Sequence, residues 1–260
     1  MNEFIGILPA AGLGSRLQPF RYAKELLPVF FKTDDRENGK RVYPRAAAEY
    51  SIQAMRHANI QFVLTVISDR KTEVIKYFSD GRDFDINIAY LHQKEPYGLS
   101  DAINKGFQWY KNSYVFLALP DTIFYPFHAI RAIREEILAS QADLVLGVFP
   151  TSKPEQLGPV RFDSSGKAIE VLDKPKVSSV FNTWGIAGWS PTFSKLLNQY
   201  MAISLEAQKQ PIGNIFNLAI TRGLNVRTVF FKDGEYIDLG TPEGLAHVIL
   251  NRELSGLKEI

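Results

Sequence analysis

The chain contains no cysteine, which excludes structural disulfides and zinc sites built from thiolates. No apolar run approaches the length of a membrane-spanning helix. The first residues show neither the basic segment nor the cleavage site of a secretory signal. We therefore expect a cytoplasmic protein without a membrane partner. No metal-binding or catalytic-triad spacing is recognisable around the four histidines, which we interpret as ordinary surface or interface residues: His57, His92, His128 and His247.

An excess of one charge sign is also lacking. The 30 lysines and arginines nearly balance the 28 acidic residues, for a net charge of +2. This balance gives no bulk electrostatic reason to bind nucleic acid, although a nucleotide needs only a locally positive cleft. A hydrophobic content of 45% indicates an ample core. No repeat or clear linker interrupts the chain, so we expect a single domain over residues 1–260, with homo-oligomers left open.

Strand-like and helix-like segments alternate along the chain. After a first strand at 4–10 we expect a long loop through residue 41, and then helices at 44–59, 71–78, 99–110 and 127–139 between strands at 62–67, 86–91, 114–119 and 143–150. This alternation predicts an α/β fold with a mostly parallel, doubly wound sheet. After about residue 150 the pattern predicts a smaller β-rich region, which begins with a hairpin over 160–172 and contains strands at 183–189 and 226–231. Helices are expected there at 192–205, 213–222 and 241–252.

The first strand ends in a loop of small residues that carries one arginine, and a lysine follows: Ala10-Ala11-Gly12-Leu13-Gly14-Ser15-Arg16-Leu17 and then Lys24-Glu25-Leu26-Leu27-Pro28. Small residues let backbone N–H groups approach a polyphosphate, and the Arg16 guanidinium can fork onto its oxygens. A P-loop would need a lysine at an offset where none stands. A dinucleotide fingerprint would need glycine in place of Leu17. A plain strand-to-helix turn is the structural alternative.

This combination resembles the signature of nucleotidyltransferases that join a nucleoside triphosphate to a sugar 1-phosphate, and is most similar to glucose-1-phosphate uridylyl- and thymidylyltransferases. The resemblance implies the Rossmann-like fold of nucleotide-diphospho-sugar transferases, with nucleotide bound by residues 1–150 and sugar phosphate by residues 151–260. It implies catalytic roles for Arg16 at the leaving pyrophosphate and for Lys24 at the α-phosphate. It also implies nucleotide contacts from Ala10, Ala11, Gly12 and Gly14.

A second motif, Gln93-Lys94-Glu95-Pro96-Tyr97-Gly98, stands between a strand and a helix. Loops at the carboxyl ends of parallel strands line the ligand crevice of such sheets. A glutamine amide offers both a donor and an acceptor to a base edge. The resemblance implies that Gln93 and Gly98 contact a pyrimidine, which favours UTP or dTTP, and the alternative is a solvated turn.

Two aspartates, Asp121 and Asp238, each follow a strand-like run. We expect both runs to belong to one parallel sheet, so that the two carboxylates meet. Asp121 alone could be a turn or N-cap residue. A helix cap explains Thr241 and Pro242 but leaves Asp238 without a role. The resemblance implies that both aspartates bind Mg²⁺, which commonly takes one or two protein carboxylates together with substrate phosphates.

The region after residue 150 holds the sugar-side candidates. In Asp173-Lys174-Pro175, the resemblance implies that Lys174 meets the sugar phosphate and acts in catalysis, and that Asp173 and Gly158 contact the sugar. Asp173 stands where the family usually has glutamate, and Leu157 where it has tyrosine. The segment at 182–185 also departs from glucose-type enzymes, which leaves the sugar open. Two alternatives remain: a cytidylyltransferase acting on a non-sugar phosphate, and a non-catalytic relative that binds nucleotide-sugar.

Overall fold

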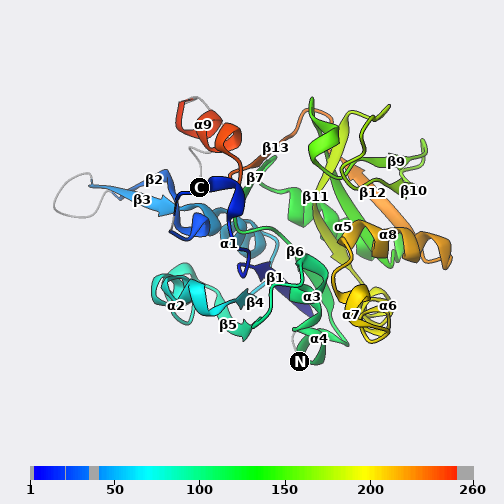
Figure 1. Cartoon of the computed structure of the whole chain (residues 1–260), viewed down its shortest axis with the longest axis horizontal. Coiled ribbons are helices and arrows are strands. Elements are labelled where there is room, and N and C mark those ends of the chain that lie inside the picture. Colours follow the sequence, from blue (N-terminus) through cyan, green and yellow to red (C-terminus); the bar gives the residue numbers. More distant parts are fainter. Residues whose placement is uncertain (1–2, 21, 35–40, 251–260) are drawn as a thin grey trace.

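The computed structural model describes residues 3–20, 22–34 and 41–250. A seven-stranded sheet lies at its centre, in the order β12-β8-β11-β6-β1-β4-β5 (Figure 1). All neighbouring pairs are parallel except those of β11, which is antiparallel to both of its neighbours. The mostly parallel α/β sheet expected from the sequence is thus confirmed. The strand bounds are β1 Phe4–Pro9, β4 Phe62–Ile67, β5 Asn87–His92, β6 Tyr114–Leu117, β8 Leu144–Pro150, β11 Asn182–Trp189 and β12 Val226–Phe230.

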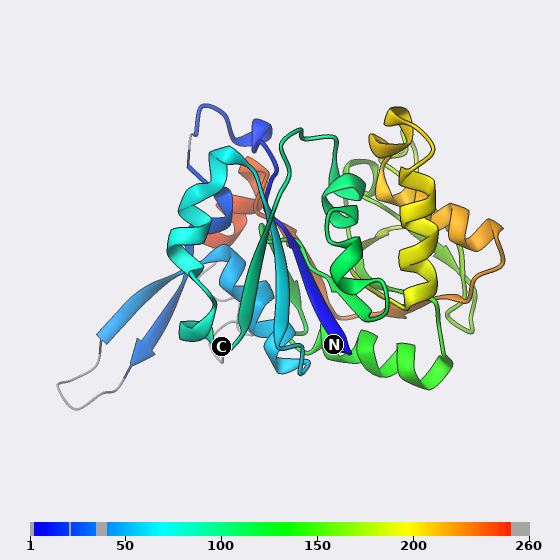
Figure 2. The same cartoon turned by 90° about the horizontal axis from the view of Figure 1, so that it is seen from below.

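Helices cover both faces of this sheet, and Figure 2 shows the strands between them. The hydrophobic core on one face includes residues of α1 Ala47–His57, α2 Thr72–Phe78 and α5 Ala129–Ser140. The core on the other face includes residues of α3 Leu99–Asn104, α4 Phe107–Tyr110, α6 Pro191–Met201 and α8 Ile212–Thr221. Two further helices are α7 Leu205–Gln208 and α9 Pro242–Leu250. No helix in the described ranges is both long and apolar enough to cross a membrane.

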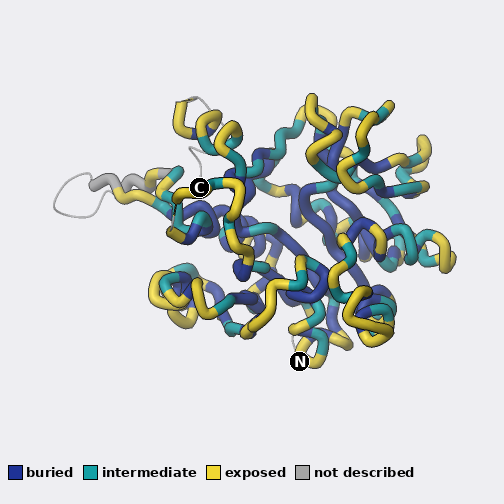
Figure 3. The backbone as a smooth tube through the Cα atoms, in the orientation of Figure 1, coloured by how far each residue is buried: buried dark blue, intermediate teal, exposed yellow. Residues whose placement is uncertain are grey.

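Central strands of the sheet are buried on both faces, which explains their unbroken apolar runs. In β1, Ile5 and Ile7 face one core and Leu8 faces the other. In β6, Leu117 and Phe116 divide between the cores in the same way. Figure 3 shows these strands as the buried centre of the molecule.

Three two-stranded sheets surround the central one. The expected hairpin is present as β9 Val160–Phe162 and β10 Ala168–Val171. The loop expected before residue 41 instead contains β2 Pro28–Asp34, which pairs with β3 Arg41–Ala46 in an arm that projects from the body (Figures 1 and 2). The third sheet pairs β7 Thr122–Tyr125 with β13 Glu235–Asp238.

Three of the expected helices differ from the structure. The helix expected at 192–205 ends at Met201, and Leu205 begins the separate helix α7. The helix expected at 44–59 begins only at Ala47, because Pro44 lies in β3. β3 pairs with β2 alone, and proline is tolerated in an edge strand of this kind. The helix expected at 99–110 is divided into α3 and α4 at Lys105 and Gly106.

Candidate active site

Four neighbouring parallel strands, β6, β1, β4 and β5, end at the same edge of the central sheet. The segments that follow them are 118–121, 10–17, 68–71 and 93–98, and all of these except 68–71 carry candidate residues. Because parallel strands point the same way, these segments gather along one edge, where open α/β sheets bind ligands. The topology therefore places these candidates along one edge of the sheet.

The loop after β1 turns sharply at Gly14, whose φ of +64° suits glycine. A 3₁₀ turn, Ser15–Leu17, follows and carries Arg16. Ala10 and Ala11 are buried, whereas Gly12 is exposed. A cavity of about 210 Å³ lies beside this loop, lined in part by Gly12, Gly14, Lys24, Arg70 and Lys71. The cavity thus combines small residues of this loop with cations from the next segment and from the segment after β4.

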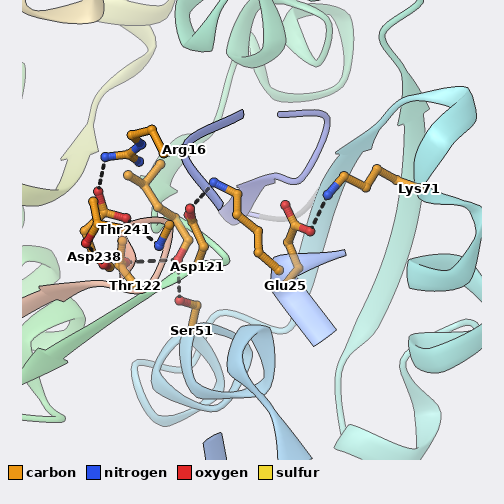
Figure 4. Close-up of polar contacts among 11 residues, drawn as sticks. Arg16, Glu25, Ser51, Lys71, Asp121, Thr122, Asp238 and Thr241 are labelled. Atoms are coloured by element: carbon orange, nitrogen blue, oxygen red, sulfur yellow. Dashed lines mark hydrogen bonds and ion pairs between the residues drawn. The ribbon is translucent and has the colours of Figure 1, made fainter. Parts of the chain in front are cut away.

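Asp121 and Asp238 meet through the β7–β13 ladder (Figure 4). In this antiparallel pair Asp238 stands opposite Thr122, and the backbone N–H of Leu239 donates to the carbonyl of Asp121 at 2.9 Å. The expectation that one parallel sheet carries both aspartates is wrong. Asp121 lies in the short link between β6 and β7, and Asp238 ends a strand of the separate small sheet.

Two cations pair with these carboxylates. Arg16 Nη1 lies 2.8 Å from Asp238 Oδ2, and Lys24 Nζ forms an ion pair with Asp121 Oδ2. Burial lowers the pKa of Lys24, but the Asp121 carboxylate outweighs it and leaves that pKa above its ordinary 10.5. Lys24 is therefore charged at neutral pH, and each carboxylate of the cluster faces one basic side chain. The Arg16 side chain is 52% exposed, so its guanidinium is free to turn toward a ligand.

Backbone groups hold the aspartates in place. Gly240 N–H donates to Asp238 Oδ1 at 2.8 Å. A Cβ built on Gly240 would lie 2.8 Å from Asp121 Oδ2, 2.8 Å from Asp238 Oδ1 and 2.9 Å from Arg16 Nη2. The carbonyl of Leu119, just before Asp121, accepts hydrogen bonds from the hydroxyls of Ser51 and Thr122 (Figure 4). The cluster thus packs against Gly240 and leaves no room for a side chain at that position.

Next to Lys24 in the sequence, Glu25 forms an ion pair with Lys71 at 2.6 Å (Figure 4). The sequence did not indicate this pair. Their side chains are 1% and 8% exposed. Burial raises the pKa of Glu25, and Lys71 opposes that rise. The pair joins the segment that carries Lys24 to the segment after β4, and so fixes one wall of the cavity.

Gln93 and Gly98 lie at the far end of the same edge. The backbone N–H of Gln93 donates to the carbonyl of Ile67, at the end of β4. The Gln93 side chain is buried, and its Nε2 donates to Asp101 Oδ2 at 2.7 Å and to the Gly98 carbonyl at 3.3 Å. The amide donor is therefore occupied within the protein.

The sugar-side candidates come together with one another. Lys174 N–H donates to the carbonyl of Leu157 at 2.9 Å, which places Lys174 and Asp173 beside Gly158. Both charged side chains are exposed, and Lys174 has a φ of +43°. The Trp184 indole packs closely over Gly158. No direct contact joins these residues to the aspartate cluster within the part of the chain that the structure describes.

Tyr236 connects the two groups. Its ring lies against Gly185, next to Trp184, and stacks on Phe149 at 5.9 Å. Burial, followed by the charges of Asp238 and Asp121, raises the pKa of Tyr236 well above its ordinary 10.0. A neutral phenol therefore lies between the aspartates and the segment that covers Gly158.

The aspartate pair suits a hard cation such as Mg²⁺. Asp121 Oδ2 and Asp238 Oδ1 each lie 2.8 Å from the position that a Gly240 Cβ would occupy, so the two oxygens are neighbours and both could serve as ligands. Among the described residues no group of three or more histidine and acidic side chains could hold a metal. A magnesium ion here would therefore take its other ligands from water and substrate phosphate, as this ion commonly does.

The chain is similar in sequence to known nucleotidyltransferases. A family model described as nucleotidyl transferase matches residues 5–253. A glucose-1-phosphate thymidylyltransferase of Mycolicibacterium smegmatis is 32% identical over 175 residues, which cover 66% of this chain and 55% of that protein. One from Neisseria gonorrhoeae is 27% identical over 249 residues, 92% of this chain and 79% of that protein. The chain thus spans between about half and four fifths of the length of these two relatives.

Solved structures share the fold. A Bacillus anthracis structure assigned as a glucose-1-phosphate thymidylyltransferase, in complex with sucrose, superposes with a TM-score of 0.82 at 22% identity and covers 96% of both chains. The UTP-bound UGPase of Acinetobacter baumannii gives a TM-score of 0.72 at 18% identity, over 96% of this chain and 93% of that one. Because the family model matches nearly the whole chain, the chain belongs to the nucleotidyl transferase family.

Proposed function

We propose that this protein joins a nucleoside triphosphate to a sugar 1-phosphate and releases pyrophosphate. The observation that carries the proposal is the meeting of Arg16, Lys24, Asp121 and Asp238 at one edge of the sheet. These residues supply two cations for phosphates and two carboxylates for a metal. The named activities of the relatives, thymidylyl transfer to glucose 1-phosphate, are of this class.

The reaction needs positioning and charge neutralisation more than covalent chemistry from the protein. An oxygen of the sugar 1-phosphate attacks the α-phosphorus and forms a new P–O bond. The bond from the α-phosphorus to the bridging oxygen breaks, and its electron pair leaves with the pyrophosphate. No covalent enzyme intermediate is required.

In this mechanism Arg16 and Lys24 exchange partners. Without ligand they neutralise Asp238 and Asp121. Once a triphosphate enters, Arg16 turns onto the leaving pyrophosphate and Lys24 meets the α-phosphate, where added charge is stabilised. Asp121 and Asp238, released from these cations, would hold Mg²⁺, whose charge would help to neutralise the phosphates.

The remaining candidates divide between the two substrates. Ala10, Ala11, Gly12 and Gly14 would offer a close backbone approach to the nucleotide. Gln93 and Gly98 would face the base, with UTP or dTTP as the donor. On the other half, residues 151–260, the exposed Lys174 would meet the sugar phosphate, while Asp173 and Gly158 would contact the sugar.

A matrix of triphosphates against sugar 1-phosphates, assayed by pyrophosphate release, tests this proposal. We expect release with UTP or dTTP and a hexose 1-phosphate, and much less with ATP or GTP. Release with CTP and phosphocholine alone would favour the cytidylyltransferase alternative. Binding of a nucleotide-sugar without any release would favour the non-catalytic relative.

A further inference from the structure

A buried carboxylate fixes the orientation of the Gln93 amide. Asp101 is 3% exposed, and its Oδ2 faces Gln93 Nε2 at 2.7 Å. The Gly98 carbonyl faces the same amide group at 3.3 Å. Both neighbours can only accept hydrogen bonds, so the group turned toward them must be the NH₂. The chemistry of these neighbours thus settles which end of the amide is which.

Lys105 forms an ion pair with the same carboxylate. Its ammonium lies 3.2 Å from Asp101 Oδ1, the oxygen that does not meet Gln93. An ionised carboxylate has no proton to donate, so the amide gains nothing by turning over. The two carboxylate oxygens of Asp101 therefore have different partners: Oδ2 accepts from Gln93 and Oδ1 pairs with Lys105.

The Gln93 oxygen is the part of the amide that remains for a ligand. Within the described residues, no hydrogen bond to Gln93 Oε1 occurs, and this oxygen is not among their solvent-inaccessible unpaired atoms. Gln93 lies at the carboxyl end of β5, on the edge where the loop after β1 also lies. The base end of the crevice thus offers an acceptor and no amide donor.

We propose that Asp101 is a positioning residue that makes this subsite select uracil or thymine over cytosine. Uracil and thymine carry an N3–H donor, which an amide oxygen accepts. Cytosine carries a lone pair at N3, which an oxygen repels. A site built around a hydrogen bond rejects a partner that leaves its polar group unpaired. The inference rests on the proposed function for its ligand, a pyrimidine nucleoside triphosphate.

The Asp101→Asn variant tests this inference, with the ratio of Kd for CTP to Kd for UTP measured by calorimetry. Lys105 attracts the oxygen of the introduced amide, so the NH₂ of that amide turns toward Gln93 and the Gln93 amide must turn over. We expect the wild type to favour UTP by about 100-fold or more, and the variant to lose at least about tenfold of that ratio. Lys105→Met, which keeps the carboxylate, should retain the ratio within about threefold.

A structural defect would weaken both nucleotides together and leave the ratio unchanged, and that result overturns the inference. An equal loss in Lys105→Met also overturns it. If Asp101→Asn fails to fold, N3-methyl-UTP tests the wild type directly, because it lacks the donor. Binding of this analogue as tight as that of UTP overturns the inference. Because binding needs no turnover, an inactive enzyme with an intact ratio would refute the proposed activity alone, whereas failure to bind any pyrimidine triphosphate would refute both.

Discussion

Gly240→Ala places one methyl group inside the proposed catalytic cluster. Its Cβ would lie 2.8 Å from Asp121 Oδ2 and from Asp238 Oδ1, and 2.9 Å from Arg16 Nη2. Comfortable contacts between nonbonded heavy atoms begin near 3.5 Å. The three groups must therefore retreat by roughly 0.5–1 Å. Arg16 can do so cheaply because its side chain is 52% exposed, but the two carboxylates are 11% and 17% exposed and confined.

Overpacking of this kind costs about 1–3 kcal/mol of stability. A displacement of about 1 Å in a catalytic constellation can lower the rate by about 10²-fold. We therefore expect Gly240→Ala to fold, with a modestly lower Tm, and to lose about 10²-fold or more in kcat. The assay is pyrophosphate release at saturating substrates, beside a thermal melt.

Gly213→Ala is the matched control, because its Cβ would meet only Val171 Cγ1 at an ordinary 3.5 Å. It lies in the first turn of α8, away from the aspartates, so we expect unchanged activity. Turnover of Gly240→Ala within threefold of the wild type would refute the argument that this cluster has no room for a side chain.

Two further changes test the proposed roles in the cluster. Arg16→Ala should lower kcat by about 10²–10³ with the fold intact, as the loss of a transition-state donor does, and unchanged turnover in a folded variant would contradict the role. Asp121→Asn and Asp238→Asn should each remove most activity, and the double variant should be little worse than either because residues acting as a unit are not additive. EDTA should abolish the activity of the wild type until Mg²⁺ is added back. Full activity in EDTA would refute a metal role.

The central sheet could be predicted because its strands are local apolar runs. β1 and β6 are buried on both faces, so they show continuous hydrophobicity between turn signals. Strand β7 is not predicted, because its signal is short. It directly follows Asp121, and its partner β13 lies more than a hundred residues later. Its four residues are strand-favouring types, but so short a run after a turn does not by itself predict a strand, and the pairing with β13 is visible only in three dimensions.

The break between α3 and α4 shows the same limit. Apolar residues at helical spacing continue through Gly106, so periodicity alone predicts one helix. A Cβ on Gly106 would lie 2.7 Å from the Tyr110 ring and 3.2 Å from Leu64 of the sheet. Close packing against a strand thus requires the glycine there, and this requirement is visible only in three dimensions.

For the candidate site, motif order selects the residue types but not their partners. Arg16 stands out because it is the one charged residue of the sequence between positions 10 and 20, and Lys24 follows it closely. Their pairing with Asp238 and Asp121 depends on a ladder between segments far apart in sequence. Asp101 gave no signal of its role, because an acidic residue in the first turn of a helix is common.

The buried pair Glu25–Lys71 yields a prediction about stability and pH. Lys71→Met removes the ammonium from a carboxylate whose side chain is 1% exposed. Loss of one partner of a buried pair costs about 3–5 kcal/mol. Burial already holds the pKa of Glu25 above its ordinary 4.5, and Lys71 opposes that rise, so the variant raises this pKa further. A raised pKa contributes stability below 4.5 that is lost as pH rises through the folded value. The loss in the free energy of unfolding of Lys71→Met, measured by urea unfolding, should therefore be smallest near pH 4.5 and grow toward pH 8.

The double variant Glu25→Met/Lys71→Met should recover most of this loss, since no charge is then buried. Lys76→Met, at an exposed position of α2, should change stability by no more than about 0.5 kcal/mol. A deficit for Lys71→Met that stays constant across this pH range would show that its cause is lost packing and not an unpaired carboxylate.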